Sequence, residues 1–342
     1  MSANDGMKKI PGALAPLRNF SADGLTDEQD FLLRDIARRS RLNAILMTAL
    51  ASSGHPGGSL SSMDMYVMLM ASANLTPENC EEMGRDRVVV SHGHTAPGVY
   101  GALAEWGFID RNEVVPNFRR TGSAYPGHVE RSVPGVEWGT GNLGQGLSAG
   151  VGFAIAGRMC GRDSRVFVTM GDGEQPKGQN AEARRVAVKE RLSGLTALID
   201  YNHIQISGAV EDVMPVNLRA LWEADGWEVF ESDGHDYRAL YAALKKAVYA
   251  PKPAVILCRT LMGKGVSFME GTHEYHGKVP SGDLLIKAVE ELGGNQSEID
   301  VLRNMRKGEL PKGRAVSRFI PSIDTGAPIV YSASDKKDNR GA

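Results

Sequence analysis

Apolar residues at the start of this chain recur with helical spacing. Between residues 25 and 54, the stretch LTDEQDFLLRDIARRSRLNAILMTALASSG places apolar side chains three and four positions apart, as in a helix with one buried face. A candidate capping box, Thr26 followed by Gln29, marks the start of this helix, and Gly54 marks its end. The sequence therefore predicts a long helix that leads directly into the segment GHPGG.

Short β-branched runs alternate with helical patterns along the rest of the chain. Apolar residues with helical spacing, as at 236–249, separate one run from the next. Strands that alternate with helices form a parallel sheet. We therefore predict an α/β fold, a parallel sheet flanked by helices, from about residue 25 to about residue 300. The expected strands are 87–91, 165–170, 195–200, 227–232 and 254–260.

The chain divides into three expected segments. Its 342 residues, of which 42% are hydrophobic, suffice for the core of one large domain. We assign an N-terminal arm to residues 1–25 and the folded domain to residues 26–307. From 308 to 342 the sequence becomes basic and then contains Pro, Gly and Ser without apolar periodicity, which is typical of a tail or linker.

Charge and hydropathy exclude two classes of partner. The formal net charge is −2 and no dense block of Lys and Arg occurs, so we expect no nucleic-acid partner. The longest apolar stretch, at 42–51, is far shorter than the roughly 20 residues of a membrane span, and no signal peptide is recognisable. We therefore expect no membrane partner and a cytoplasmic location. Cys80, Cys160 and Cys258 lack metal-ligand spacing and are interpreted as reduced core thiols.

An acidic glycine turn follows one predicted strand, and an asparagine follows the next. Gly171, Asp172 and Gly173 come after the run RVFVTM, helical sequence continues to about residue 193, and Asn202 follows the run LTALID. A strand, a crossover helix and a second parallel strand bring both strand ends to the same edge of the sheet. If the two strands are neighbours, Asp172 and Asn202 face one point.

That point lies at the carboxyl ends of the strands, where open α/β sheets bind ligands. Carboxylate, amide and backbone carbonyl oxygens suit Mg²⁺, whose octahedron two phosphate oxygens and a water would complete. Gly171 and Gly173 allow a sharp turn close to a phosphate. A GDG tripeptide alone is more often a simple acidic turn, but between two strands and with Asn202 30 positions after Asp172 it predicts a metal-bound diphosphate. Neither a P-loop nor a dinucleotide-binding motif competes with this interpretation.

These residues are similar to the diphosphate and metal motif of thiamine-diphosphate enzymes, and among them of the transketolases. Four further segments resemble transketolase motifs in the family's order, so the resemblance extends over about residues 30–300. It implies a thiamine-diphosphate-binding (PP-domain) fold, with thiamine diphosphate and Mg²⁺, or Ca²⁺ or Mn²⁺, as cofactors. The segments are SGHPGGSLS at 53–61, VVVSHGHTAPGVYGAL at 88–103, GSAYPGHVERSVPGVEWGTGNLGQGLSAGVG at 122–152 and GKGVSFMEGTHEYHGKVP at 263–280.

The resemblance also implies roles for individual residues. Asp172, Asn202 and the backbone of Ile204 would bind the metal ion, while Gly141 and Leu143 would meet the aminopyrimidine through backbone groups. Further cofactor contacts are expected around the diphosphate. The complete expected cofactor site comprises His94, Gly141, Asn142, Leu143, Gly171, Asp172, Gly173, Glu174, Asn202, Ile204 and His276.

Three histidines, His55, His128 and His276, match those that line the substrate channel of the family and are the expected catalytic residues. An imidazole can hydrogen-bond sugar hydroxyls and carry protons near neutral pH. A lone histidine is usually a surface residue or a satisfied core residue, and we prefer this interpretation for His92, His203, His235 and His273. Of these four, His92 and His273 are nevertheless expected near the site.

Lys177 departs from the family pattern. Transketolases typically carry a glutamate five residues beyond the metal-binding aspartate, within a carboxylate array that links the two cofactors across the dimer. A lysine there puts this proton network in doubt, although Glu182 matches the family. Two interpretations stay open: Lys177 is an interface or solvated cation paired with a local carboxylate, or it retunes the site.

The pyrimidine-binding domain of the family does not follow in this sequence, which ends at DNRGA. In transketolases a glutamate of that domain activates the cofactor. We therefore expect the N-terminal subunit of a split transketolase, which transfers a two-carbon ketol unit from a ketose to an aldose phosphate in a heterotetramer with a C-terminal subunit. Two alternatives remain: a related thiamine-diphosphate C2-transfer subunit of sulfosugar or natural-product metabolism, and a non-catalytic scaffold subunit.

Overall fold

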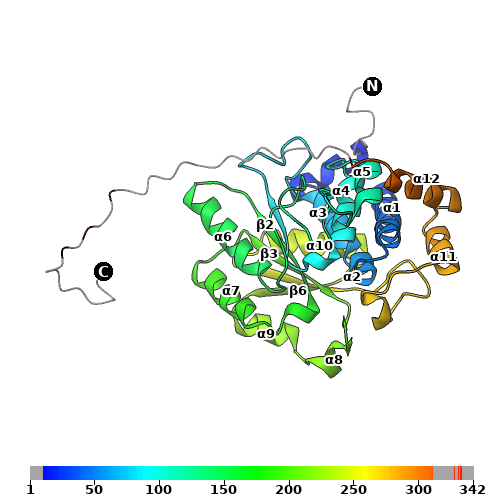
Figure 1. Ribbon diagram of the computed structural model, residues 1–342. Coiled ribbons are helices and arrows are strands. Elements are labelled where there is room, and N and C mark those ends of the chain that lie inside the picture. The colour runs from blue at the N-terminus through cyan, green and yellow to red at the C-terminus, as the bar shows by residue number, and fades with distance from the viewer. Residues whose placement is uncertain (1–10, 311–326, 328–329, 331, 333–342) are drawn as a thin grey trace.

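A five-stranded parallel sheet forms the centre of the molecule (Figure 1). The computed structural model describes residues 11–310 together with 327, 330 and 332. The strand order is β1-β2-β3-β7-β6, and all four pairings are parallel. The predicted α/β fold is thereby confirmed, with strand ends that differ by at most one residue from those expected. The strands are β1 (Arg87–Val90), β2 (Val166–Gly171), β3 (Leu195–Tyr201), β6 (Glu228–Asp233) and β7 (Ala254–Arg259).

Alternate residues of the strands face two separate cores, because side chains along a strand point to opposite faces. Phe167 and Leu198 belong to the larger core, while their strand neighbours Val168 and Ala197 belong to the smaller one. The larger core lies under α1 (Asp27–Ala51), α3 (Met63–Ser72), α4 (Ala96–Glu105), α5 (Arg111–Asn117), α10 (Tyr237–Val248), α11 (Asp283–Glu291) and α12 (Gln296–Lys307). The smaller core lies under α6 (Gly146–Met159), α7 (Gly178–Lys189) and α9 (Leu218–Ala224), which cover the other face in Figure 1.

The first long helix begins as predicted. The Gln29 N–H donates to Thr26 Oγ1 at 3.2 Å and the Thr26 N–H donates to Gln29 Oε1 at 3.0 Å, so the capping box is confirmed. The helix ends earlier than expected, at Ala51, because Ser52 takes the left-handed conformation with φ of 51° and closes the last turn through its N–H. Gly54 lies beyond this cap.

Short elements complete the edge of the sheet at which the strands end. Their approach depends on glycine: a Cβ on Gly57 of α2 would lie 2.7 Å from the Tyr275 carbonyl oxygen of η4. The short elements at this edge are α2 (Pro56–Ser61), η2 (Gly93–Thr95), η3 (Asp172–Glu174), β4 (Ile204–Gln205), β5 (Gly208–Ala209), α8 (Val210–Val213) and η4 (His273–His276). A further short element, η1 (Gly12–Phe20), packs on α3 and places Phe20 against Phe167 at the start of β2.

Several further expectations concern single residues and the chain ends. Cys258 is buried and Cys80 half-buried, but Cys160 is exposed, so its interpretation as a core thiol is wrong. It caps the C-terminus of α6, beyond the last buried turn of that helix. The expected tail falls outside the described residues except for 308–310 and three isolated positions. Within the described part of the chain, no helix is long and apolar enough to cross a membrane.

Candidate functional site

The ends of β2 and β3 bring Asp172 and Asn202 to one cavity. Gly171 and Asp200 are paired in the register of these strands, and Asp172 and Asn202 are the first residues beyond the two strands. Both line a cavity of about 360 Å³. The crossover connection predicted from the sequence therefore places its two polar residues at one site.

Hydrogen bonds tie the two strand ends together. The backbone N–H of His203 donates to Asp172 Oδ2 at 2.7 Å, which fixes the carboxylate relative to the segment after β3. The Asn202 side-chain nitrogen donates to Asp200 Oδ2 at 3.0 Å and to Ser61 Oγ at 3.3 Å. Its side-chain oxygen accepts from the Ile204 N–H at 3.0 Å. The amide orientation of Asn202 is thus set by its neighbours.

Asp200 is a site residue that the sequence analysis did not select. This carboxylate is only 3% exposed and accepts hydrogen bonds from Ser61 Oγ at 2.6 Å, from Ser62 Oγ at 2.8 Å and from Thr260 Oγ1. The signal in the sequence is an acid at the end of the buried run LTALID, where an unpaired charge would be costly. Asp200 lines the cavity and orients Asn202.

The electrostatics at Asp172 favour a cation. Burial, followed by the charge of Asp200, raises the pKa of Asp172 to about 8. Two acids in a buried site are stabilised by a positive charge, and the donor set of carboxylate, amide and backbone carbonyl suits a divalent ion with oxygen ligands. Among the described residues, no cluster of three or more His, Cys, Asp or Glu could hold a metal ion, but this set needs only one of those types.

Unpartnered polar atoms show that the cavity fits a polar ligand. His55 Nδ1, His276 Nδ1 and Gln205 Nε2 are buried and have no hydrogen-bond partner, and all three residues line the cavity. Buried polar groups are nearly always hydrogen-bonded in proteins, so these atoms are expected to meet bound groups. Thiamine diphosphate with a divalent ion meets this requirement.

Four histidines converge on the same cavity. The ring centroid of His55 lies 5.1 Å from that of His94, 5.5 Å from that of His276 and 6.5 Å from that of His128. Burial, reinforced by the neighbouring rings and Arg119, lowers the pKa of His55 to about 4. Burial is also the first cause of the lowered pKa values of His94, His128 and His276. These imidazoles are therefore neutral near pH 7.

The other four histidines have different surroundings. His92 lines the cavity, as expected for a residue near the site, and its Nε2 lies 2.5 Å from the Tyr66 hydroxyl. His235 bonds Asp64 through Nδ1 at 2.7 Å and accepts from the Leu261 N–H through Nε2, as a satisfied core residue does. His203 pairs with Glu211 at the surface, and His273 is exposed and does not line the cavity.

A glycine loop forms another wall of the cavity. Gly141 and Leu143 line it, whereas Asn142 does not. The Gly144 N–H donates to Glu174 Oε2, which also accepts from Ser91 Oγ at 2.6 Å. The second oxygen of Glu174 accepts from the Gly171 N–H at 2.9 Å, so this carboxyl joins the end of β2 to the glycine loop. Burial raises the pKa of Glu174 to about 7.

Lys177 contacts this loop rather than a carboxylate. Its Nζ donates to Asn142 Oδ1, and a Cβ on Gly144 would lie 2.9 Å from its Cδ. The attraction of its charge is also one of the causes that lower the pKa of Glu174 against the effect of burial. Glu182 is exposed on α7.

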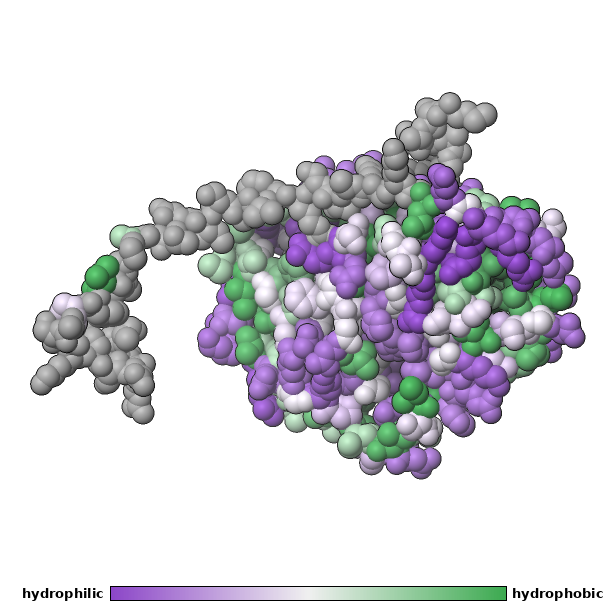
Figure 2. Space-filling model, viewed as in Figure 1, coloured by the Kyte–Doolittle hydropathy of each residue, from purple (hydrophilic) through white to green (hydrophobic). Residues whose placement is uncertain are grey.

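The rim of the cavity is apolar on one side. Ile206, which lines the cavity, is 70% exposed, and Val213 and Met214 nearby are 40% and 52% exposed. Figure 2 shows hydrophobic residues near α8 at the lower edge of the molecule.

A parallel sheet with a carboxylate, an amide and a glycine loop at its strand ends defines an α/β domain of the class that binds a cofactor at the carboxyl edge of the sheet. Residues 33–307 match the family model described as transketolase, thiamine diphosphate binding domain. The chain belongs to the transketolase family.

Two relatives are named as subunits of transketolases. The chain is 36% identical to an apulose-4-phosphate transketolase subunit of Phocaeicola vulgatus, over 78% of this chain and 96% of that protein. It is 38% identical to a 6-deoxy-6-sulfo-D-fructose transketolase subunit of a Clostridium species, over 70% and 88% of the two chains. The crystal structure of transketolase from Campylobacter jejuni is similar, with a TM-score of 0.74, 32% identity, and coverage of 81% of this chain but only 46% of that chain.

These findings confirm the expected fold and the resemblance to the N-terminal subunit of a split transketolase. They also confirm the expected class of activity, thiamine-diphosphate-dependent ketol transfer by a transferase.

Proposed function

We propose that this chain is the thiamine-diphosphate-binding subunit of a two-subunit transketolase that acts on sugar phosphates. A separate C-terminal subunit would supply the pyrimidine-binding and C-terminal domains, in a heterotetramer with two sites. One observation carries the proposal: the apulose-4-phosphate transketolase subunit matches over 96% of its length, whereas the chain spans only 46% of the Campylobacter jejuni transketolase chain. The apolar rim at Ile206, Val213 and Met214 supports a partner that covers the cavity.

The metal ion in this proposal is Mg²⁺, or Ca²⁺ or Mn²⁺, held by Asp172, Asn202 and the backbone carbonyl of Ile204. The position of both side chains at the carboxyl ends of adjacent strands supports this set, as does the raised pKa of Asp172, which a divalent ion would lower again. Gly171, Gly173 and Glu174 form the turn next to the diphosphate, and Glu174 holds this turn against the glycine loop.

In this proposal the cofactor ring lies against the glycine loop. Gly141 and Leu143 offer backbone groups to the aminopyrimidine, as both line the cavity. The Asn142 side chain is bonded to Lys177 instead, so any contribution of Asn142 to the cofactor comes from its backbone. His94 and His276, whose ring centroids lie 5.4 Å apart, are proposed beside the diphosphate.

Bound thiamine diphosphate supplies the nucleophilic carbon that cleaves and re-forms the carbon–carbon bond next to a ketose carbonyl. The protein orients the sugar and moves protons. His55, His128 and His276 are neutral near pH 7, so each can donate one hydrogen bond and accept another from a hydroxyl. The unpartnered Nδ1 atoms of His55 and His276 are the groups that we assign to this task.

The test is reconstitution of the full chain with its C-terminal partner. Ketol transfer between a ketose phosphate and an aldose phosphate should require both subunits, thiamine diphosphate and a divalent ion. Activity of one chain without the other, or activity without the cofactor, would contradict the proposal. Donor profiling that includes 6-deoxy-6-sulfo-fructose separates the pentose-phosphate assignment from the sulfosugar alternative.

Calorimetry distinguishes a catalytic role from that of a scaffold. Thiamine diphosphate and Mg²⁺ should bind the complex with measurable heat, and Asp172→Ala should abolish the dependence on Mg²⁺. The absence of any binding to the wild-type complex would instead favour the scaffold alternative.

A further inference from the structure

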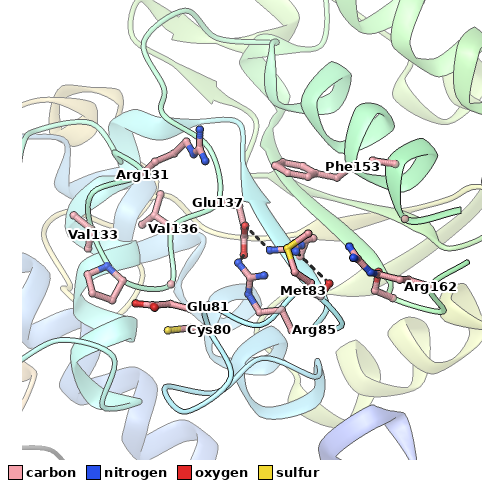
Figure 3. Close-up of a pocket in the computed structure, with 16 residues that line it drawn as sticks. Cys80, Glu81, Met83, Arg85, Arg131, Val133, Val136, Glu137, Phe153 and Arg162 are labelled. Atoms are coloured by element: carbon pink, nitrogen blue, oxygen red, sulfur yellow. Dashed lines mark hydrogen bonds and ion pairs between the residues drawn. The ribbon is translucent and has the colours of Figure 1, made fainter. Parts of the chain in front are cut away.

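A second cavity lies apart from the candidate site, with which it shares no lining residue. Its volume is about 310 Å³. It lies between the segment before β1, the loop that leads to Gly141, and helix α6 with the turn that follows it (Figure 3). The cavity thus has walls from three separate parts of the chain.

The lining of this cavity is strongly cationic. Four arginines line it, but only two carboxylates, Glu81 and Glu137. Glu137 is buried and shared, because Arg85 Nη2 lies 2.5 Å from one of its oxygens and Arg87 Nη1 lies 3.2 Å from the other. One carboxylate therefore balances two guanidinium groups, and the lining keeps an excess of positive charge.

Arg85 retains an unused donor inside the protein. This residue is only 8% exposed, and its Nε is buried without a hydrogen-bond partner. An unsatisfied buried donor on a charged group is costly, so an acceptor is expected at this position when the cavity is filled. Because Arg85 lines the cavity, a bound anion can supply that acceptor.

Two further arginines of the lining contribute positive charge to the cavity. Within the described part of the chain, neither Arg131 nor Arg162 makes an ion pair or a side-chain hydrogen bond to another residue. Figure 3 shows them on opposite sides of the ion pairs around Glu137. Arginine donors arranged around one space favour phosphate, because a guanidinium matches phosphate oxygens in a bidentate manner.

The rest of the wall is apolar and fits a carbon skeleton. Val133, Val136 and Phe153 line the cavity beside the arginines, and the Arg87 guanidinium lies 5.9 Å from the Phe153 ring centroid. We infer that this cavity is a binding site for a phosphate monoester, whose phosphate meets Arg85, Arg131 and Arg162 and whose organic part packs on Phe153. This inference does not depend on the proposed transketolase function.

The test uses phenyl phosphate as the probe in a calorimetric titration of the full chain. Thiamine diphosphate and Mg²⁺ are present in excess, so that any anion site in the other cavity is filled. Wild-type protein should bind one equivalent, and both Arg162→Gln and Arg131→Gln should weaken binding by roughly tenfold, the loss expected for one charge-assisted hydrogen bond. Arg131 is exposed and Arg162 is half-buried, whereas Arg85 is buried, so these two variants should fold.

Arg158→Gln is the matched control, because Arg158 lies on α6 but pairs with Glu190 and does not line the cavity. Its affinity should stay within twofold of wild type. Absence of saturable binding, or equal weakening in all three variants, overturns the inference. It is also overturned by loss of binding in the complex with the C-terminal subunit, because the partner then fills the cavity. The measured change in phenyl phosphate affinity depends on Arg131 and Arg162. The test therefore remains valid even if thiamine diphosphate does not bind.

Discussion

The Asp200 carboxylate accepts a hydrogen bond from the Asn202 side-chain nitrogen at 3.0 Å. The side-chain amide of Asn202 has a donor nitrogen at one end and an acceptor oxygen at the other. A contact between the nitrogen and Asp200 therefore turns the oxygen away from Asp200. With the nitrogen held by Asp200 and Ser61, the oxygen is directed away from both. In the proposed metal site, Asp200 would therefore act indirectly, by orienting the side chain of Asn202.

Asp200→Asn should weaken divalent-ion binding by tenfold to a hundredfold, the usual effect of losing a group that orients a metal ligand. The change keeps the shape of the side chain but removes its charge and leaves one of its atoms a donor. The measurement is the Mg²⁺ concentration dependence of thiamine diphosphate binding. Asp163→Asn, at an exposed position in the loop before β2, is the control and should bind as wild type. Unchanged Mg²⁺ dependence in Asp200→Asn would sink this role.

Asp172 should make the metal-free protein less stable as the pH rises. Its pKa is raised from 3.8 to about 8 by burial and then by Asp200, so between about pH 4 and about pH 8 the folded protein keeps a proton that the unfolded chain has released. Stability contributed by this group is present below pH 4 and lost as the pH rises to 8. The lowered pKa values of the histidines act in the opposite direction in part of this window.

A comparison with Asp172→Asn isolates the effect, because the contribution of the histidines largely cancels in the difference. The free energy of unfolding of the variant minus that of wild type should increase with pH by up to about 1.4 kcal/mol per unit. Denaturant titrations at pH 5, 6.5 and 8 without divalent ions measure it. At pH 8, saturating Mg²⁺ should make the wild-type protein more stable to unfolding than Asp172→Asn. A difference that stays flat between pH 5 and pH 8 would refute the assignment.

His55→Asn should lower kcat/KM for ketol transfer by about a hundredfold, within the range for loss of a proton-transfer group. The imidazole of His55 sits among His94, His128 and His276 and has an unpartnered Nδ1. Steady-state kinetics of the two-subunit complex provide the measurement. His273→Asn, an exposed change outside the cavity, should retain full activity. Similar kinetics for both variants would contradict a catalytic role.

Lys177→Met should weaken thiamine diphosphate binding several-fold, because it removes the hydrogen bond that holds Asn142 in the glycine loop. Lys177→Glu should weaken it further, since a negative charge would replace the cation near buried Glu174. Calorimetric affinities of the complex test both expectations. Lys189→Met, near the exposed end of the same helix, serves as the matched control. Wild-type affinity in Lys177→Glu would instead favour Lys177 as a solvated cation.

Much of the fold was predictable because its signals are local. All five strands of the sheet lie within two residues of the β-branched runs, and the Thr26–Gln29 capping box starts the first helix as expected. Helix ends were less predictable. The helix after Gly173 stops at Lys189 rather than near residue 193, because Arg191 takes the left-handed conformation and the chain reverses there. Such reversals depend on packing against the following strand.

The candidate site was predictable only where topology alone brings residues together. A right-handed crossover between adjacent parallel strands is nearly obligatory, so Asp172 and Asn202 could be paired without a structure. The partner of Asn202 could not, because Asp200 is shared among hydroxyl donors from segments more than fifty residues apart. The direction of Asn142 toward Lys177 also required coordinates.

Periodicity and short-range chemistry along the chain were enough to establish the order of strands and helices, the position of the acidic turn and the family. The packed molecule was needed to show which buried groups share a site and how their charges interact. The cavity lined by Arg85, Arg131 and Arg162 has no motif in the chain, since its walls come from three separate segments. Burial and charge proximity arise only on folding, which is why the pKa of Asp172 and the unused donor of Arg85 could not be read from the order of residues.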